Sequence, residues 1–300
     1  MSDGLDLTPD SSVAPSTALR GIYLFCVTTA RAPGLPMEAL DGTVTMSIVE
    51  PGRSGQPDLV AITCPVDLSD WQGARGEAQL KDVAWLGPRA IRHEQIIEQV
   101  MASGPVLPLR FGCIFSGEAR LRSWLGQHQA TLRAFLRDIT NFGEWSIKGW
   151  LSPARAVSAL AKESDSDGGK PESPGARYLR EQQQKQALAR RARDWARAEA
   201  ASIVESLAPH TARVRALGYL PGSASGREEE VAFHCALLCP STQVAALQQA
   251  VDALNKSYAP RGLQLALSGP WPPYSFCPRL DEPAAPPSPQ TVPQAGSELA

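Results

Sequence analysis

Residues 144–151 read EWSIKGWL, which we interpret as the first β-strand of the series that decides the fold. A long helical pattern follows from Ala176 to about Ala208, with apolar residues spaced among arginines and glutamines. Two strand patterns come next, ARVRALGYL (212–220) and EVAFHCALLCP (230–240). The C-terminal half therefore begins with the order strand, helix, strand, strand.

One more helix and one more strand complete this series. The helix has a clean apolar stripe of four residues, namely Val244, Leu247, Val251 and Leu254. Ser241 or Thr242 is its predicted N-cap, and the alternating stretch GLQLALSG (262–269) predicts the last strand. The order strand, helix, strand, strand, helix, strand predicts a ferredoxin-like βαββαβ sandwich.

The N-terminal half carries further strand patterns. Three of them are GIYLFCVTT (21–29), TVTMSIVE (43–50) and DLVAITCPV (58–66). A fourth, VLPLRFGCIF (106–115), contains Pro108, which we expect at a sheet edge or near the start of the strand. Together with two helical patterns, these strands predict an α+β domain.

The two helical patterns lie between and after these strands. The first runs from Asp82 to Ala102, and its predicted face consists of Val83, Leu86, Ala90, Ile91, Ile97 and Val100. The second should end near Asn141 after an N-cap at Ser116. Its stripe comprises Leu121, Trp124, Leu125, His128, Leu132, Phe135, Leu136 and Ile139. Both helices should pack one apolar face on the N-terminal strands.

These patterns divide the chain into an α+β protein of two domains. The N-terminal α+β domain spans residues 19–142, and the ferredoxin-like domain spans residues 143–277. The hydrophilic stretch 162–175 is predicted to be a flexible insert because it cannot bury enough apolar surface to order itself. We expect a disordered leader at 1–18 and a disordered proline-rich tail at 278–300.

Composition narrows the possible classes of protein. The formal net charge of −2 gives no bulk attraction to nucleic acid, and no apolar run approaches the roughly 20 residues that cross a bilayer. Six scattered cysteines lie mostly in apolar strand patterns and are expected to be reduced. We therefore expect a cytoplasmic protein that binds neither nucleic acid nor membranes.

Local motifs for catalysis or cofactor binding fail on inspection. RHEQIIE (92–98) begins like a zinc-protease helix, but Ile97 stands where the second histidine is needed, so His93 and Glu94 are expected on the polar face. Cys235 and Cys239 would lie about 13 Å apart along one strand, too far to share a metal ion. No phosphate-binding glycine loop or nucleophile elbow is present. We predict no catalytic, cofactor-binding or metal-binding residues.

The stretch GPWPPYSF (269–276) is unusual because it combines aromatic residues with prolines. Proline lacks a backbone donor and restricts the residue before it, so the preceding strand should stop here. Polyproline II geometry would place Trp271 and Tyr274 on one side of a stiff ribbon. This segment could form a protein contact or fold back and cover the core. The candidate residues for either role are Trp271, Pro272, Pro273, Tyr274 and Phe276.

Four motifs together resemble the gas vesicle protein GvpL/GvpF family. They are VLPLRFG (106–112), EWSIKGWL (144–151), ARYLREQQ (176–183) and GPWPPYSF (269–276), and the resemblance spans roughly residues 20–277. It implies an α+β N-terminal domain followed by a modified ferredoxin-like domain. It also implies an accessory or minor component of gas vesicles that is not an enzyme and needs no cofactor. Such a protein would assist nucleation or assembly and contact the hydrophobic shell protein, with other accessory proteins as further partners.

Other classes of function remain open at this point. A ferredoxin-like regulatory or ligand-sensing protein of the cytoplasm would need a pocket with convergent polar groups. An enzyme would need titratable side chains grouped in a cleft. Arg190, Arg191, Arg193 and Arg197 form a basic cluster on the long helical pattern, where a solvated face is favoured over RNA binding.

Overall fold

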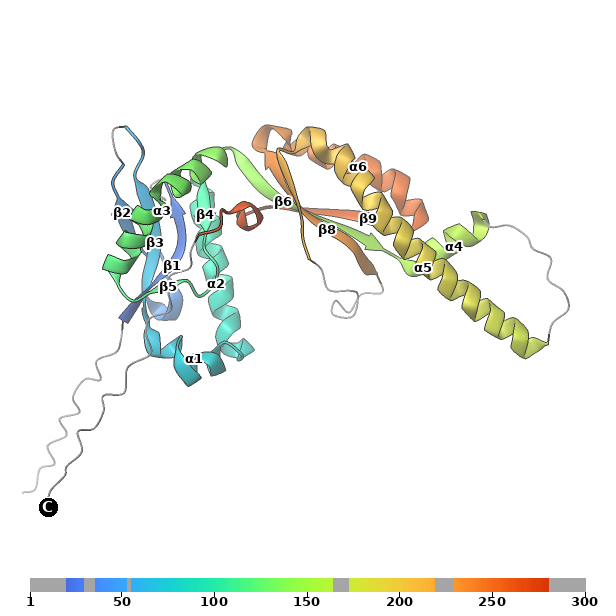
Figure 1. Cartoon of the computed structure of the whole chain (residues 1–300), viewed down its shortest axis with the longest axis horizontal. Helices are drawn as coiled ribbons and strands as arrows, with labels where there is room; N and C mark the ends of the chain where they lie inside the picture. The colour runs from blue at the N-terminus through green and yellow to red at the C-terminus, as the bar shows by residue number, and fades with distance from the viewer. Residues whose placement is uncertain (1–19, 30–35, 53–54, 164–172, 219–228, 281–300) are drawn as a thin grey trace, which may run out of the picture.

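The protein contains two antiparallel sheets that follow one another along the molecule (Figure 1). The computed structural model describes residues 20–29, 36–52, 55–163, 173–218 and 229–280. The predicted leader 1–18 lies outside the described residues, as do positions 164–172 of the predicted insert and 281–300 of the predicted tail. Of the described insert positions, 162–163 end one helix and 174–175 begin the next, while Ser173 is not helical.

The first sheet has the strand order β2-β3-β1-β4, and β5 also pairs with β1. Its strands are β1 (Arg20–Thr28), β2 (Met46–Glu50), β3 (Leu59–Asp67), β4 (Val106–Pro108) and β5 (Ile114–Phe115). The three predicted N-terminal strands are therefore confirmed. The single strand predicted over 106–115 was wrong, because the chain leaves the sheet after Pro108 and turns at Gly112, which has a φ of +86°. Pro108 does lie on an outer strand, as expected.

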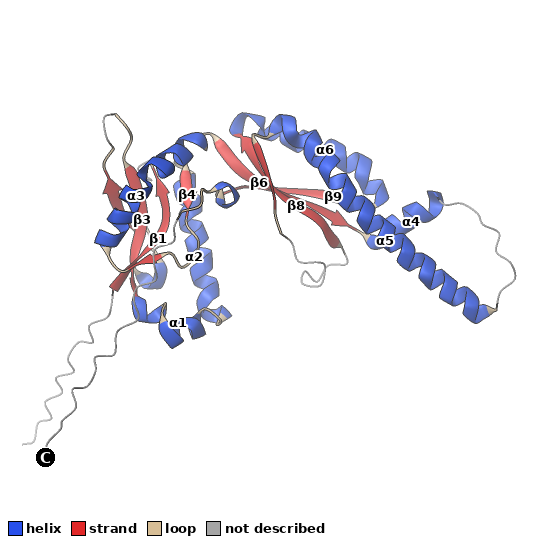
Figure 2. Cartoon of the chain, viewed as in Figure 1, coloured by secondary structure: helices blue, strands red, loops and turns tan. Residues whose placement is uncertain are grey.

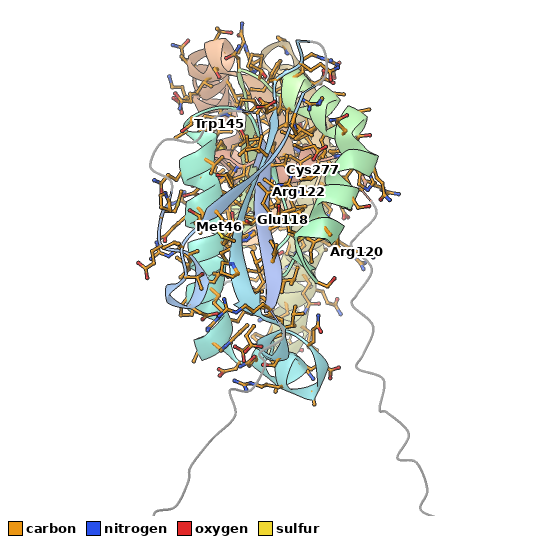
Figure 3. All side chains as sticks on the ribbon, turned by 90° about the vertical axis from the view of Figure 1, so that its left-hand side faces the viewer. Met46, Glu118, Arg120, Arg122, Trp145 and Cys277 are labelled. Atoms are coloured by element: carbon orange, nitrogen blue, oxygen red, sulfur yellow. The ribbon has the colours of Figure 1, made fainter. Side chains whose placement is uncertain are left out.

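Helices cover both faces of the first sheet. They are α1 (Gly73–Gln79), α2 (Val83–Met101) and α3 (Glu118–Asp138). Figure 3 shows α2 and α3 on opposite sides of the strands. α3 uses most of its predicted stripe, whereas α2 buries His93, Ile96, Ile97 and Val100. Val83 and Ile91 were wrongly assigned to the buried face, since both are exposed.

The second sheet has the order β7-β8-β6-β9. Its strands are β6 (Phe142–Leu151), β7 (Arg213–Ala216), β8 (Glu230–Pro240) and β9 (Leu263–Trp271). The helices of this half are α4 (Pro153–Glu163), α5 (Pro174–Leu207) and α6 (Val244–Tyr258). Apart from α4, which was not predicted, this order follows the predicted series. α5 and α6 lie on the same side of the sheet (Figure 2) and share one core with it.

Both N-caps predicted for serine or threonine were wrong. α3 begins after Gly117, and α6 begins after Gln243, and neither residue caps its helix with a side-chain hydrogen bond. The Ser241 hydroxyl instead donates to the backbone oxygen of Asn141 at 2.9 Å. That contact ties the end of β8 to the start of β6, so tertiary structure uses the side chain that local propensity assigned to a cap.

The core beneath α3 continues from the first sheet into the second. It contains Leu24 and Val27 of β1, and it also contains Ala236 and Leu238 of β8 and the ring of Phe276. The six cysteines are free thiols, of which four are buried and Cys113 and Cys277 are half-buried. The two sheets are therefore joined by a shared apolar core.

Candidate protein-contact site

The last strand does not end where the sequence predicted. β9 continues through Gly269 and Pro270 to Trp271, which pairs with Glu144 after a register shift. Proline is tolerated there because β9 is an outer strand, so its missing donor leaves no ladder bond broken. Gly269 has a φ of +143°, and a Cβ there would lie 2.8 Å from the Glu144 backbone oxygen. The strand thus continues because glycine allows this close approach.

The five candidate residues of GPWPPYSF fall into two environments. Trp271 is 44% exposed, and its indole N–H donates to the Ser268 hydroxyl. Pro272 and Pro273 are buried, Tyr274 is half-buried, and Phe276 is only 7% exposed. Residues 274–276 form one 3-10 turn, so the polyproline II prediction was wrong for this part. Only Trp271 is placed for an external contact, and the residues after it close the core.

Residues 272–280, which we name the strap, run from β9 back to the first sheet. The Tyr274 hydroxyl donates to Glu94 of α2 at 2.9 Å. The Phe276 ring enters the shared core, and the Arg213 guanidinium lies 5.2 Å from its centre. Figure 1 shows the strap turn between the two sheets. The strap therefore connects the two halves through the side chains of Tyr274 and Phe276.

A buried histidine anchors the strap on the first sheet. His93 is 1% exposed, and its Nε2 lies 3.1 Å from the Leu109 carbonyl oxygen. Since a carbonyl only accepts, Nε2 carries the proton and Nδ1 accepts from the Tyr23 hydroxyl at 2.9 Å. Burial lowers the pKa of His93 to about 4. The ring is therefore neutral at pH 7, and it lies 3.2 Å from the Tyr274 hydroxyl.

A buried carboxylate of the second sheet holds the next residue of the strap, Ser275. Glu144 of β6 accepts from the Ser275 hydroxyl at 2.6 Å and from the Ser275 backbone N–H at 2.9 Å. Burial raises the pKa of Glu144, while the two bonds from Ser275 and the charge of Arg215 act in the opposite direction.

Sequence reasoning missed both anchors. It placed His93 on a polar face, although the spacing of His93, Ile96, Ile97 and Val100 is that of one buried helical side. That spacing was the available signal. Glu144 gave no comparable signal, because its burial depends on the strap, whose Ser275 lies 131 residues further along the chain.

The outer edge of the first sheet exposes apolar side chains. β2 pairs only with β3, and Met46 and Val49 on this strand are 42% and 40% exposed. Val44, just before the strand, is also exposed. Arg122 of α3 donates to the Val49 backbone oxygen at 3.0 Å. We name Val44, Met46 and Val49 the β2 edge, which combines an outer strand with apolar side chains.

A second exposed apolar surface lies on α1 and α2. It consists of Leu80, which follows α1, and of Val83 and Ile91 on α2. The last two are eight residues apart and so about 12 Å along the helix. Unlike the β2 edge, this surface lies on helices, so it offers no strand to which a partner could add another strand.

The described residues offer little for chemistry. Among them, no three histidine, cysteine, aspartate or glutamate side chains lie close enough together to hold a metal ion. None of their helices is long and apolar enough to cross a membrane. A hollow between α5 and β8, lined by Leu151, Arg193 and Glu230 among others, has a volume of about 10 Å³. Ligand pockets usually measure several hundred Å³, so this hollow is no ligand site.

Comparison with known proteins identifies the family. The family model described as "Gas vesicle synthesis protein GvpL/GvpF" matches residues 21–278. Gas vesicle protein L of a Streptomyces species is 29% identical over 75% of this chain and 85% of its own length. Gas vesicle protein L2 of Halobacterium salinarum is 26% identical over 92% of this chain and 99% of its own length.

Two solved structures show the same mixed fold with two antiparallel sheets. The gas vesicle protein GvpF of an Anabaena species superposes with a TM-score of 0.60 at 18% identity, covering 88% of this chain and 98% of that chain. GvpF of Microcystis aeruginosa gives a TM-score of 0.57 at 20% identity, covering 86% and 99%. With the family model matched over most of its length, the chain belongs to the gas vesicle synthesis protein GvpL/GvpF family.

Proposed function

We propose that the protein is an accessory or minor structural component of gas vesicles that assists their nucleation or assembly. Membership of the GvpL/GvpF family and the names of its relatives support a gas-vesicle-related role. In this proposal the protein is cytoplasmic, associates with the vesicle and acts without catalysis. Its main partner is the hydrophobic shell protein, and other accessory proteins are further partners.

The β2 edge is the observation that carries this proposal. A shell subunit with an apolar face aggregates unless that face is covered before the subunit joins the wall. An outer strand can bind an extended segment of such a subunit through main-chain hydrogen bonds, while apolar side chains beside it add contact area. Met46 and Val49 supply those side chains on an outer strand.

The strap has a supporting role in this proposal. It ties Glu144 of the second sheet to Glu94 and His93 of the first through Ser275 and Tyr274. A rigid connection would hold a bound shell subunit at a fixed position relative to the second half. The strand order of that half, β7-β8-β6-β9, supports our further inference that it is a modified ferredoxin-like domain of a two-domain protein.

Co-expression with the gas vesicle shell protein tests the proposal. We would capture the full chain from soluble extract and compare the shell protein retained by wild type with that retained by Met46→Lys/Val49→Lys. Lysine on an outer strand opposes pairing and removes apolar contact area, so retention should fall at least about ten-fold.

Two matched variants locate the contact. Val83→Lys/Ile91→Lys makes the same change on the second apolar surface, and Trp271→Ala removes the exposed aromatic of GPWPPYSF. Both should retain the shell protein at wild-type level. Circular dichroism must show all variants folded. Loss of binding confined to Trp271→Ala or to the α2 variant would move the contact away from β2, and failure of wild type to retain the shell protein would remove support for direct binding.

A further inference from the structure

The first turns of α5 project from the molecule without a core of their own. Residues 177–191 contain no buried side chain, and Ala192 directly after them is fully buried. Figure 1 shows this part of α5 extending beyond the second sheet and away from α4. We name residues 177–191 the α5 arm.

The α5 arm is strongly basic. It carries one carboxylate, Glu181, and five cations, namely Arg177, Arg180, Lys185, Arg190 and Arg191. Arg177 pairs with Glu181 at 3.1 Å. Lys185, Arg190 and Arg191 form no ion pair with any residue that the structure describes. The arm thus has an excess of positive charge in a chain whose net charge is −2.

Where α5 packs on the second sheet, one of its arginines pairs with a carboxylate. Arg193 makes a bidentate pair with Glu230 of β8, with both N–O distances at 2.7 Å. This pairing lies two residues beyond the arm. Among the residues that the structure describes, Arg193 thus has a carboxylate partner on β8, whereas Lys185, Arg190 and Arg191 have none.

Apolar side chains add a second kind of contact at the free end of the arm. Tyr178 and Leu179 are 61% and 63% exposed, although both are large enough to bury considerable area. The arm continues a helix that is packed further along, but none of its own side chains is buried, so it lacks the packing that stabilises the rest of α5. A partner that covered these residues would therefore also stabilise the helix.

We propose that the α5 arm binds an acidic, helix-forming segment of a partner protein, at a surface separate from the shell contact. Glutamates of the partner would face Lys185 and Arg190, which lie on the same side of the helix as Tyr178 and Leu179, and its apolar side would cover those two residues. A nucleic acid fits less well, because Tyr178 is the one aromatic side chain of the arm that could stack on a base and the net charge of −2 gives no bulk attraction to a long polyanion.

A synthetic probe tests this inference with the full chain. The probe is a fluorescent 18-residue peptide with leucines at helical spacing and glutamates elsewhere, and its matched control replaces each glutamate by glutamine. The arm variant is Arg190→Glu/Arg191→Glu. Arg120→Glu/Arg137→Glu reverses two exposed arginines on α3 and changes the net charge equally.

We expect the acidic peptide to bind wild type and the α3 variant with similar Kd. The arm variant should bind at least about ten-fold more weakly, and added salt should reduce the difference. Amides of 177–191 should exchange more slowly in the complex. All substituted side chains are exposed, so we expect the Tm of both variants to be unchanged. An unchanged Tm and unchanged capture of the shell protein would show that the variants are folded.

Three results would overturn the inference. One is equal binding of the acidic peptide to the two double variants, and another is equal binding of the glutamine peptide to wild type. The third is tighter binding of a single-stranded RNA 18-mer than of the acidic peptide, which would assign the arm to nucleic acid instead. Failure of wild type and all variants to capture the shell protein would count against the proposed function. The peptide-binding comparison would still test the inference about the α5 arm.

Discussion

The first sheet is covered on both faces, by α2 and by α3, whereas the second sheet carries α5 and α6 on one face only. On its other face the strap covers Ala236 and Leu238, and beyond the strap Gln264 and Ala266 are exposed. Antiparallel sheets commonly leave one face in water. The strap thus marks the boundary between the covered and open parts of the second sheet.

The hydrophobic pattern of the strands reflects whether helices cover one or both faces of their sheet. β1 has eight successive positions that are buried or half-buried after Arg20, because side chains pointing either way meet a helix. β9 alternates buried Leu263 and Leu265 with exposed Gln264 and Ala266. A continuous apolar strand therefore indicates two covered faces, and an alternating strand indicates one. The following predictions test that difference, in order of expected effect.

Removing a side chain from the doubly covered sheet should have the largest effect. Phe25→Ala on β1 deletes a fully buried ring and should lower the free energy of unfolding by about 3–5 kcal/mol. Gln264→Ala on the open face of β9 should change it by less than about 0.5 kcal/mol. Urea denaturation measures both. Similar losses for the two variants would remove the contrast between the sheets.

His93 should make the first sheet sensitive to acid. Its folded pKa of about 4 lies below its ordinary value of 6.5, so its neutral form stabilises the fold fully above pH 6.5, and this stability is lost as pH falls toward 4. The loss should amount to about 3 kcal/mol. Compared with His93→Gln at each pH, wild type should lose this much more stability. The raised pKa values of Glu94 and Glu144 act on both proteins alike. Parallel pH curves would contradict a buried neutral His93.

Glu144 tests the part of the second sheet that the strap covers. Glu144→Ala leaves the Ser275 hydroxyl and N–H without their acceptor, which should cost about 1–3 kcal/mol. Glu144→Gln keeps an acceptor oxygen and should cost less. Limited proteolysis of the strap should accelerate in the alanine variant. Unchanged proteolysis and unfolding in both variants would show that the strap is held by Phe276 alone.

Trp271 should give the smallest effect. It lies just before the strap, is 44% exposed and makes one side-chain hydrogen bond, to Ser268. Trp271→Ala should therefore lower the free energy of unfolding by at most about 1 kcal/mol, in contrast to about 3–5 kcal/mol for Phe276→Ala. Equal losses would mean that the whole of GPWPPYSF seals the core.

Much of the fold follows from local patterns, and the rest depends on contacts between distant segments. The strands β1, β2, β3, β6, β8 and β9 and the helices α2, α3, α5 and α6 have patterns that predict them. The caps expected at Ser116 and Ser241 fail, because tertiary contacts and glycine override propensity. α4 is short and packs against α5, and the division of GPWPPYSF into an exposed Trp271 and a buried Phe276 depends on the first sheet. No local pattern encodes these features.

Hydrogen exchange of the full chain, with and without co-purified gas vesicle shell protein, tests the central claim most directly. If the shell protein adds a strand to the β2 edge, backbone amides of residues 46–50 should exchange more slowly in the complex, since outer-strand N–H groups gain partners. Exchange in α2 and at Trp271 should stay unchanged. Protection confined to α2, to Trp271 or to α5, with β2 unaffected, would contradict the proposed contact.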